Sequence, residues 1–102
     1  MTTTDGVTVT FELKMKPEAV EMFLQAVPVM LKDTAAFAGF RDIRIVQHKD
    51  DPTRLMFLER WDSEDAYDKY MAWRTSRGDM DGLAHMVVST ETNIWPRLVV
   101  AA

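Results

Sequence analysis

Alternating apolar and polar residues indicate that the chain begins with a strand. In VTVTFEL, residues 7–13, every second residue is apolar, and the residues between are threonine or glutamate. From Pro17 onward the apolar residues recur at helical spacing instead, which predicts a first helix that ends by Gly39. Pro28 interrupts this helix, because its ring removes one backbone donor and crowds the carbonyl of Leu24. We therefore expect a kink or a break at Pro28.

The middle of the chain reads as two strands followed by a helix. FRDIRIVQH, residues 40–48, is strand-like, residues 49–53 form a polar turn with a proline, and RLMFLERW, residues 54–61, is a third strand. This third strand is largely apolar on both faces. Asp62 or Ser63 is expected to cap a second helix, which has acidic residues in its first turn.

The remaining residues predict a loop and one more strand. Residues 78–85 read as a loop in which one helical turn is possible, and TNIWPRLVV, residues 92–100, reads as a final strand. Pro96 confines that strand to an edge, a bulge or a crossing point. The order of strands and helices predicts an α+β fold, the ferredoxin-like βαββαβ arrangement with an antiparallel sheet.

Such a sheet carries helices on one face only, so the apolar second face of the third strand predicts a partner. A second copy packed sheet to sheet is the simplest partner, which makes a homodimer the expected assembly. A length of 102 residues fits one domain over residues 1–102, in which residues 1–6 are expected to form a flexible N-terminus.

Composition and charge narrow the classes of function. The formal net charge is -4 and the acidic residues are scattered, which argues against a nucleic-acid partner and against an anionic membrane surface. The chain contains no cysteine, no histidine cluster with metal-ligand spacing and no glycine-rich phosphate loop, so neither a metal nor a cofactor is predicted. A cytoplasmic protein is the expectation, since no targeting or membrane-spanning segment is apparent.

The stretch FLERWDSEDAYDKY, residues 57–70, resembles the E-R-W-x-S-x-x-A signature of the antibiotic biosynthesis monooxygenase family. The spacing of AAFAGF at the end of the first helix and the DDP turn at residues 50–52 add to this resemblance. The resemblance covers roughly residues 7–75, and the remaining tail agrees only in the order of its elements. It implies a dimeric α+β barrel in which each subunit holds a cavity between its sheet and its helices.

The resemblance also implies a choice of activities. Some members of the family oxygenate polyketide-like phenols to quinones with molecular oxygen and without metal or flavin, and others degrade haem. In the haem-degrading relatives a histidine on the second helix and an asparagine in the first strand serve the haem. This chain has Tyr70 on that helix and threonines around that strand, so both haem features are missing.

Tyr70 lies near the centre of the inward side of the second helix, flanked by Tyr67, Trp73 and Arg74. As packing residues, all four would turn their rings or stems inward and keep their polar tips wet. As functional residues, Tyr70 and Arg74 would be catalytic, and Tyr67 and Trp73 would contact the substrate. A buried hydroxyl needs a partner in either case, because an unpaired one costs roughly 1 to 3 kcal/mol.

The other candidates lie outside the second helix. Trp61 is a core residue or a cavity wall, and Glu59 on the same face requires a partner, for which Arg74 or Arg97 is available. His85, in the loop before the last strand, is the candidate base for proton abstraction, unless it is an ordinary surface histidine.

Phe23, on the inward stripe of the first helix, completes the expected substrate contacts. Together with the family resemblance, which implies the reaction, these residues favour a cofactor-independent monooxygenase that converts a small aromatic or polyketide-like phenol to a quinone. The alternatives are a dimer that binds a small molecule without reaction and, less favoured, a haem protein that uses His85 or His48.

Overall fold

The structure is a computed structural model that describes residues 6–102. The flexible N-terminus expected over residues 1–6 therefore falls, except for Gly6, outside the described residues. Four strands and three α-helices occur within the described part, in the order β1 (Val7–Met15), the 3-10 turn η1 (Pro17–Ala19), α1 (Val20–Ala36), β2 (Phe40–Gln47), β3 (Arg54–Trp61), α2 (Glu64–Ser76), α3 (Asp79–Ala84) and β4 (Val87–Trp95).

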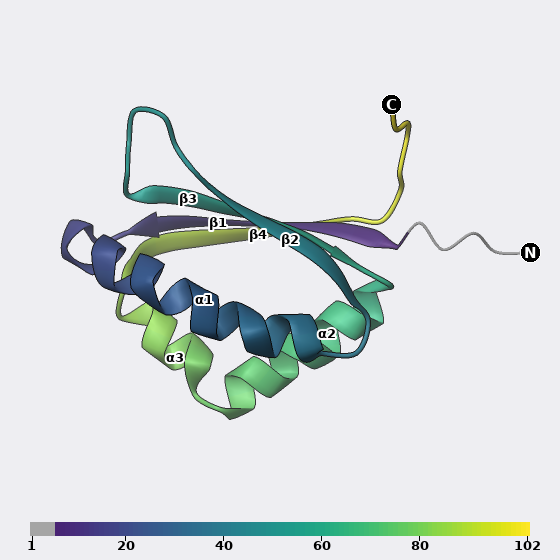
Figure 1. Ribbon diagram of the computed structural model, residues 1–102, viewed down its shortest axis with the longest axis horizontal. Coiled ribbons are helices and arrows are strands. Elements are labelled where there is room, and N and C mark those ends of the chain that lie inside the picture. The colour runs from purple at the N-terminus through teal and green to yellow at the C-terminus, as the bar shows by residue number, and fades with distance from the viewer. Residues whose placement is uncertain (1–5) are drawn as a thin grey trace, which may run out of the picture.

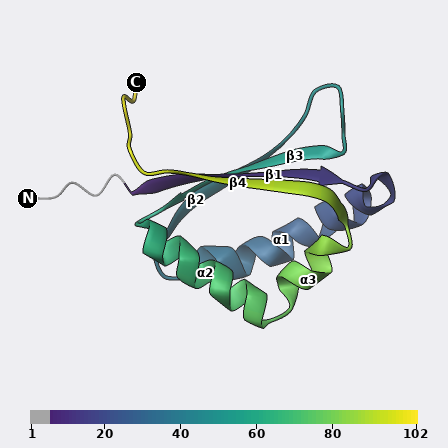
Figure 2. The same cartoon turned by 180° about the vertical axis from the view of Figure 1, so that it is seen from behind.

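The strands form one antiparallel sheet in the order β2-β3-β1-β4. All of the helices lie on one face of this sheet (Figures 1 and 2), and the other face carries no helix of the described chain. This arrangement confirms the predicted ferredoxin-like α+β fold.

The sheet face toward the helices carries the core. β1 alternates strictly between buried and half-buried residues, and its buried residues Val9, Leu13 and Met15 are at most 2% exposed. One cluster of buried side chains lies around Phe11 and Phe57 near α1, and a second lies around Trp61, against Tyr67 and Tyr70 of α2 and Phe37. The second helix therefore packs an aromatic layer on the sheet.

Two details of the predicted fold are corrected, and a third is made more definite. α1 continues through Pro28 without a break, since the proline lies on an exposed position of the helix. Residues 79–84, predicted to lie in a loop, form the short helix α3. The last strand was wrongly placed at 92–100, because β4 spans residues 87–95 and Pro96 stands after it. β4 is an edge strand, as the proline suggested.

Two residues fix the start of α2 relative to the sheet. Ser63 caps the helix, since its Oγ accepts a hydrogen bond from the backbone N of Ala66 at 3.0 Å. Gly39, in the turn between α1 and β2, has a φ of +89°, and a Cβ at this position would meet the Cβ of Ala66. Glycine is therefore required here both for its backbone angle and for the close approach of α2.

The sheet face opposite the helices, called here the outer face, is mixed in character. Met56 and Leu58 of β3 are half-buried on it, and Trp95 of β4 is 55% exposed. Arg60 pairs with Asp42 across β3 and β2 at 2.7 Å. The outer face thus combines an apolar centre with charged and polar surroundings.

Candidate functional site

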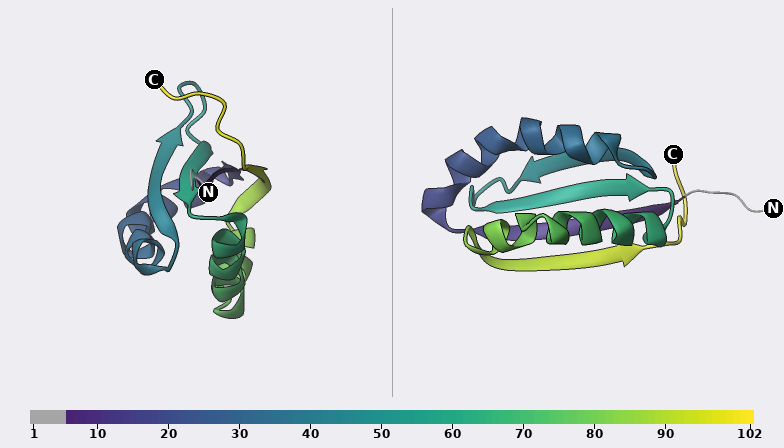
Figure 3. Two further views of the ribbon diagram at one scale, coloured as in Figure 1. Left: turned by 90° about the vertical axis from the view of Figure 1, so that its right-hand side faces the viewer. Right: turned by 90° about the horizontal axis from the view of Figure 1, so that it is seen from below.

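The helices leave a cavity of about 630 Å³ above the inner face of the sheet. β1 and β3 form its floor, α1 forms one wall, and α2 with α3 forms the other (Figure 3). Cavities of this size bind small organic molecules. The lining is chiefly apolar and includes four methionines, whose flexible side chains adapt to the shape of a ligand: Met30, Met71, Met80 and Met86.

Tyr70 lines this cavity, but its hydroxyl is hydrogen-bonded to the protein. The hydroxyl oxygen lies 2.8 Å from Oγ1 of Thr34 on α1 and 2.9 Å from Nε of Arg74. Nη2 of Arg74 donates to the backbone carbonyl of Met30 at 2.9 Å and to Oγ1 of Thr34 at 3.0 Å. Tyr70 and Arg74 therefore connect α2 to α1, and we call these four residues the helix clasp.

One arrangement of the hydrogens satisfies every hydrogen bond of the helix clasp. Arg74 can only donate, so the Tyr70 oxygen accepts from it. The Tyr70 hydroxyl then donates to Thr34, whose own hydrogen points to the carbonyl of Met30 at 3.3 Å. The single hydrogen of Tyr70 is thus used within the protein, and it is not available to a molecule in the cavity.

Charged residues from three helices meet at the opening of the cavity. Nη1 of Arg74 lies 3.0 Å from the carboxylate of Asp79 and 3.9 Å from that of Asp33. Arg77 lies 3.6 Å from Asp79 and 3.7 Å from Asp33. Two arginines and two aspartates give this rim cluster no net charge. Trp73 supports it from outside the cavity lining, with the two guanidinium groups at 5.0 and 4.6 Å from its ring centroid.

Glu59 places a carboxyl group in the apolar floor of the cavity, where it is 4% exposed. Its expected ion pair with Arg74 or Arg97 is not formed. Instead, the indole Nε1 of Trp61 donates to Oε1 of Glu59 at 3.0 Å. Trp61 itself is fully buried and does not line the cavity, so it supports Glu59 from behind.

The second carboxyl oxygen of Glu59, Oε2, has no hydrogen-bond partner among residues 6–102. No fully buried side-chain oxygen or nitrogen in this part of the chain lacks a partner, so Oε2 must contact the open space of the cavity. Burial raises the pKa of Glu59, against the opposing effects of the Trp61 hydrogen bond and the charge of Arg74.

Tyr67 presents the second free polar atom of the cavity wall. The residue is 5% exposed and lines the cavity, and none of the described residues forms a hydrogen bond with its hydroxyl. Burial and the charge of Glu59 raise the pKa of Tyr67, so the hydroxyl keeps its proton around neutral pH. Tyr67 is therefore a hydrogen-bond donor without a protein partner.

The structure brings most of the predicted site residues together, with three exceptions, which are Trp61, Trp73 and His85. Glu59, Tyr67, Tyr70, Arg74 and Phe23 all line the cavity. Trp61 and Trp73 stand behind the lining, as described above.

His85 is exposed at the end of α3 and is not part of the lining, and His48 lies on the opposite side of the sheet. Among the described residues no histidine reaches the cavity, which leaves Glu59 as its deepest proton acceptor.

Several residues of the site were not singled out from the sequence. Asp33, Arg77 and Asp79 form the rim cluster, and sequence alone did not show that three helices converge there. Thr34 was visible as a polar residue on the apolar stripe of the first helix, and such a position signals a buried hydrogen bond.

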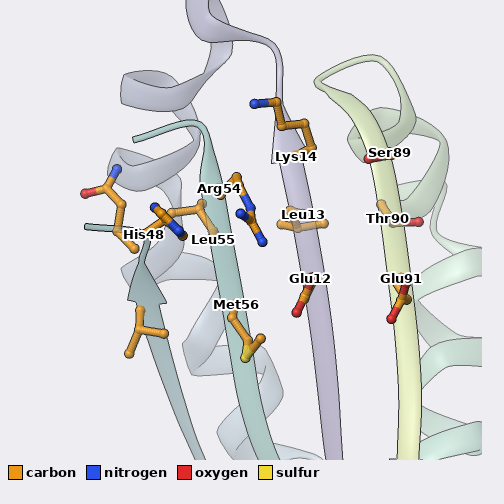
Figure 4. Close-up of a pocket in the computed structure, with 12 residues that line it drawn as sticks. Glu12, Leu13, Lys14, His48, Arg54, Leu55, Met56, Ser89, Thr90 and Glu91 are labelled. Atoms are coloured by element: carbon orange, nitrogen blue, oxygen red, sulfur yellow. The ribbon is translucent and has the colours of Figure 1, made fainter. Parts of the chain in front are cut away.

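A second depression, of about 480 Å³, lies on the outer face (Figure 4). Like charges stand opposite each other there: Glu12 pairs in register with Glu91, and Lys14 pairs in register with Arg54. Lys14 is neutralised by Asp51 at 2.6 Å. The lining of this depression is more polar than that of the cavity under the helices.

Two further features are absent from residues 6–102. No group of three or more histidine, aspartate or glutamate side chains is arranged to hold a metal ion in this part of the chain. No helix there has the length and apolar character needed to cross a lipid bilayer.

Solved structures similar to this chain confirm the fold. A conserved protein from Methanosarcina mazei aligns with a TM-score of 0.80 at 24% identity, over 90% of this chain and 92% of its own. A protein from Shewanella oneidensis aligns with a TM-score of 0.79 at 18% identity, over 93% of each chain. A structure described as an antibiotic biosynthesis monooxygenase aligns with a TM-score of 0.79 at 16% identity, over 90% of this chain and 98% of its own.

A comparison with functionally curated proteins found no match. The model of the antibiotic biosynthesis monooxygenase family, however, matches residues 6–78, which is more than half of the chain. The match includes β1, α1, β2, β3 and α2, and thus both the floor of the cavity and the helix clasp. The chain therefore belongs to the antibiotic biosynthesis monooxygenase family.

Proposed function

We propose that this protein is a cofactor-independent monooxygenase that binds a small aromatic, polyketide-like phenol in the cavity under the helices and oxidises it to a quinone. The observation that carries this proposal is a chiefly apolar cavity in which, among residues 6–102, two polar atoms of buried lining residues have no hydrogen-bond partner, Oε2 of Glu59 and the hydroxyl of Tyr67. An apolar cavity favours a flat aromatic ligand, and few, fixed polar groups orient it.

The reaction uses molecular oxygen as the oxidant. The substrate loses a proton, and the resulting anion gives one electron to oxygen, which forms superoxide and a substrate radical. These two combine to form a carbon–oxygen bond, and the peroxide takes up a proton. Loss of water leaves a carbonyl, so one oxygen atom enters the product and the other leaves as water.

Tyr67 is the group that we assign to the developing negative charge on the substrate oxygen. Its hydroxyl is protonated, buried in the wall and free to donate. A preorganised donor in a site of low dielectric stabilises such a charge more strongly than water does. The aromatic ring of Phe23 on α1 supports stacking of the substrate from the other wall.

Tyr70 and Arg74 have a different role in this proposal. Their polar atoms are engaged in the helix clasp, so they hold α1 and α2 at the spacing that the substrate needs. They act as positioning residues and not as proton donors to the substrate.

We further propose that the protein is a homodimer that packs outer face to outer face. Met56 and Leu58 support this arrangement, because a second sheet would remove these half-buried apolar side chains from water. Members of the family are typically small dimers that bind small molecules. In this arrangement the cavity stays open on the helical side of each subunit.

Oxygen uptake tests the proposed reaction. The purified, metal-stripped protein is mixed with a panel of anthrones, hydroquinones and naphthols, and uptake is compared with the spontaneous rate. We expect uptake above that rate with at least one compound, and a reduction of about tenfold or more in Tyr67→Phe. Uptake at the spontaneous rate for the whole panel would contradict the proposal.

A non-catalytic binding protein is the second candidate function. The helix clasp favours this function, because the polar atoms of Tyr70 and Arg74 are bonded to the protein and few side chains remain to act on a substrate. A binding protein would gain thermal stability from a compound of the panel and would consume no oxygen.

A further inference from the structure

Glu59 is the one carboxyl group in the floor of the cavity, and its surroundings hold it in place without neutralising it. It lies opposite Val9 of β1 and Ile43 of β2 in the sheet register, so its neighbours on both adjacent strands are apolar. Trp61 fixes Oε1 with a neutral hydrogen bond. The residue is 4% exposed, and Oε2 has no hydrogen-bond partner among residues 6–102.

The charged and titratable groups that face Glu59 come from α2, and none of them binds it directly. Arg74 directs its nitrogens to Tyr70, Thr34, Met30 and Asp79. The Tyr70 hydroxyl donates within the helix clasp, and the Tyr67 hydroxyl is kept neutral by burial and by Glu59 itself. A buried carboxyl group without a charged partner lowers the stability of the fold, and such groups are often found at functional sites, where they interact with a ligand.

We propose that Glu59 is the proton acceptor of the reaction, and that the substrate is an uncharged aromatic compound whose acidic C–H or O–H points to Oε2. This inference rests on the proposed function, because it names the base of the oxygenation and the charge of the molecule that is oxidised.

The inference of an uncharged substrate follows from the charges around the cavity. The rim cluster contains two arginines and two aspartates and therefore offers no net positive charge to an anion. A carboxylate or phosphate substrate would also approach the charge of Glu59 in an apolar floor, where like charges repel strongly. A neutral phenol or anthrone meets neither obstacle.

The proton balance of the step is simple when Glu59 is the base. The substrate C–H bond breaks, its electron pair remains on the substrate as an enolate, and the proton moves to Oε2. Molecular oxygen takes one electron and recombines as a peroxide anion, and Glu59 returns the same proton to form a hydroperoxide. Loss of water from the hydroperoxide gives the carbonyl and leaves Glu59 ionised for the next cycle.

The raised pKa of Glu59 suits this task. Burial raises the pKa of Glu59, so that it lies closer to the pKa of a weakly acidic substrate than the pKa of an exposed carboxylate does. The protonated form of Glu59 can then return its proton to a peroxide anion. General bases in such positions typically accelerate proton transfer by about 10²- to 10⁴-fold.

Anaerobic hydrogen–deuterium exchange isolates the proton transfer from the reaction with oxygen. The full-length protein is incubated with anthrone in D2O without oxygen, and deuterium at the methylene carbon is followed by NMR. We expect the native protein to accelerate exchange over buffer, and Glu59→Gln to lose about 100-fold or more of that acceleration. The amide still accepts from the Trp61 indole, and Glu64→Gln, an exposed carboxylate of α2, serves as the matched control.

A second variant tests the mechanism if Glu59→Gln does not fold. The hydrogen bond from Trp61 lowers the pKa of Glu59, so Trp61→Phe should move the inflection of the exchange rate to higher pH. A structural role of Trp61 would change the rate without moving the inflection.

The outcomes separate this inference from the proposed function. Exchange that depends on Glu59, in a protein that consumes no oxygen, would support the proton acceptor and refute the oxygenase. Native protein that does not accelerate exchange, folded Glu59→Gln that exchanges at the native rate, or an inflection that Trp61→Phe leaves in place would each overturn the assignment of Glu59.

Discussion

Substitution of Tyr70 by phenylalanine separates the structural role of the helix clasp from a role in chemistry. The change removes one hydroxyl and leaves the ring packed 4.8 Å from that of Trp61. Thr34 loses a donor, and the buried guanidinium of Arg74 loses an acceptor at Nε. The result should be a loss of stability with the cavity wall otherwise in place.

The magnitude follows from the two hydrogen bonds. The neutral bond to Thr34 contributes about 1 kcal/mol, and the bond from the charged Arg74 contributes about 2 kcal/mol. For a domain of this size, a total near 3 kcal/mol lowers the melting temperature by roughly 12 °C. Arg74 retains its bonds to Met30 and Asp79, so the helices should stay together at low temperature.

Tyr67→Phe is the matched control, because Tyr67 lies one turn earlier on the same helix and is equally buried. Its hydroxyl has no protein partner, so its removal should change stability by no more than about 0.5 kcal/mol. Thermal unfolding followed by circular dichroism, at one fixed protein concentration, compares the three proteins. The reasoning is refuted if Tyr70→Phe melts within a few degrees of the native protein, or if both variants lose the same stability.

Three further predictions concern the turn, the cavity floor and the outer face. Gly39→Ala should lower the free energy of unfolding, measured by urea denaturation, by about 3 kcal/mol, because alanine is strained at a positive φ and its Cβ would collide with α2. Gly82→Ala should have no such effect, because a Cβ at Gly82 would meet open space. Because the pKa of Glu59 is raised in the folded protein, the protonated carboxyl group favours folding at low pH, and this contribution to the free energy of unfolding is lost as the pH rises through the folded-state pKa. The melting temperature of Glu59→Gln should therefore rise relative to that of the native protein as the pH increases above about 4, the ordinary pKa of a glutamate, and a constant difference would argue against the shift. Leu58→Asp on the outer face should yield monomers in sedimentation experiments, whereas Met22→Asp on the exposed side of α1 should leave the native assembly unchanged.

Most of the fold could be predicted from the sequence, because the period of its apolar residues changes clearly between strands and helices. Residues 7–13 and 54–61 were recognisable from alternation and apolar content, and both lie in strands of the structure. The final strand was misplaced because its stretch at 87–91 is mostly exposed and lacks strong alternation. An edge strand buries little, so its sequence is weakly constrained.

The candidate site was predictable in its residue types but not in its contacts. The inward side of α2 was read correctly, since Tyr67, Tyr70 and Arg74 are its buried residues. Helical spacing cannot show which of two tyrosines meets a threonine on another helix, so the free hydroxyl and the engaged one could not be distinguished. The indole partner of Glu59 was missed for a similar reason, because an ion pair is the usual expectation for a buried carboxylate.

The helix clasp also bears on how the substrate range of this protein could change. The groups that fix the spacing of α1 and α2 make their bonds to one another, and the side chains of the methionines that shape the cavity make no part of those bonds, in which Met30 takes part only through its backbone carbonyl. Replacing Met71 or Met86 by a smaller or larger apolar residue would therefore change the local packing and leave the hydrogen bonds of the helix clasp in place. Selection for a new ligand could thus proceed in steps that do not each have to rebuild the scaffold.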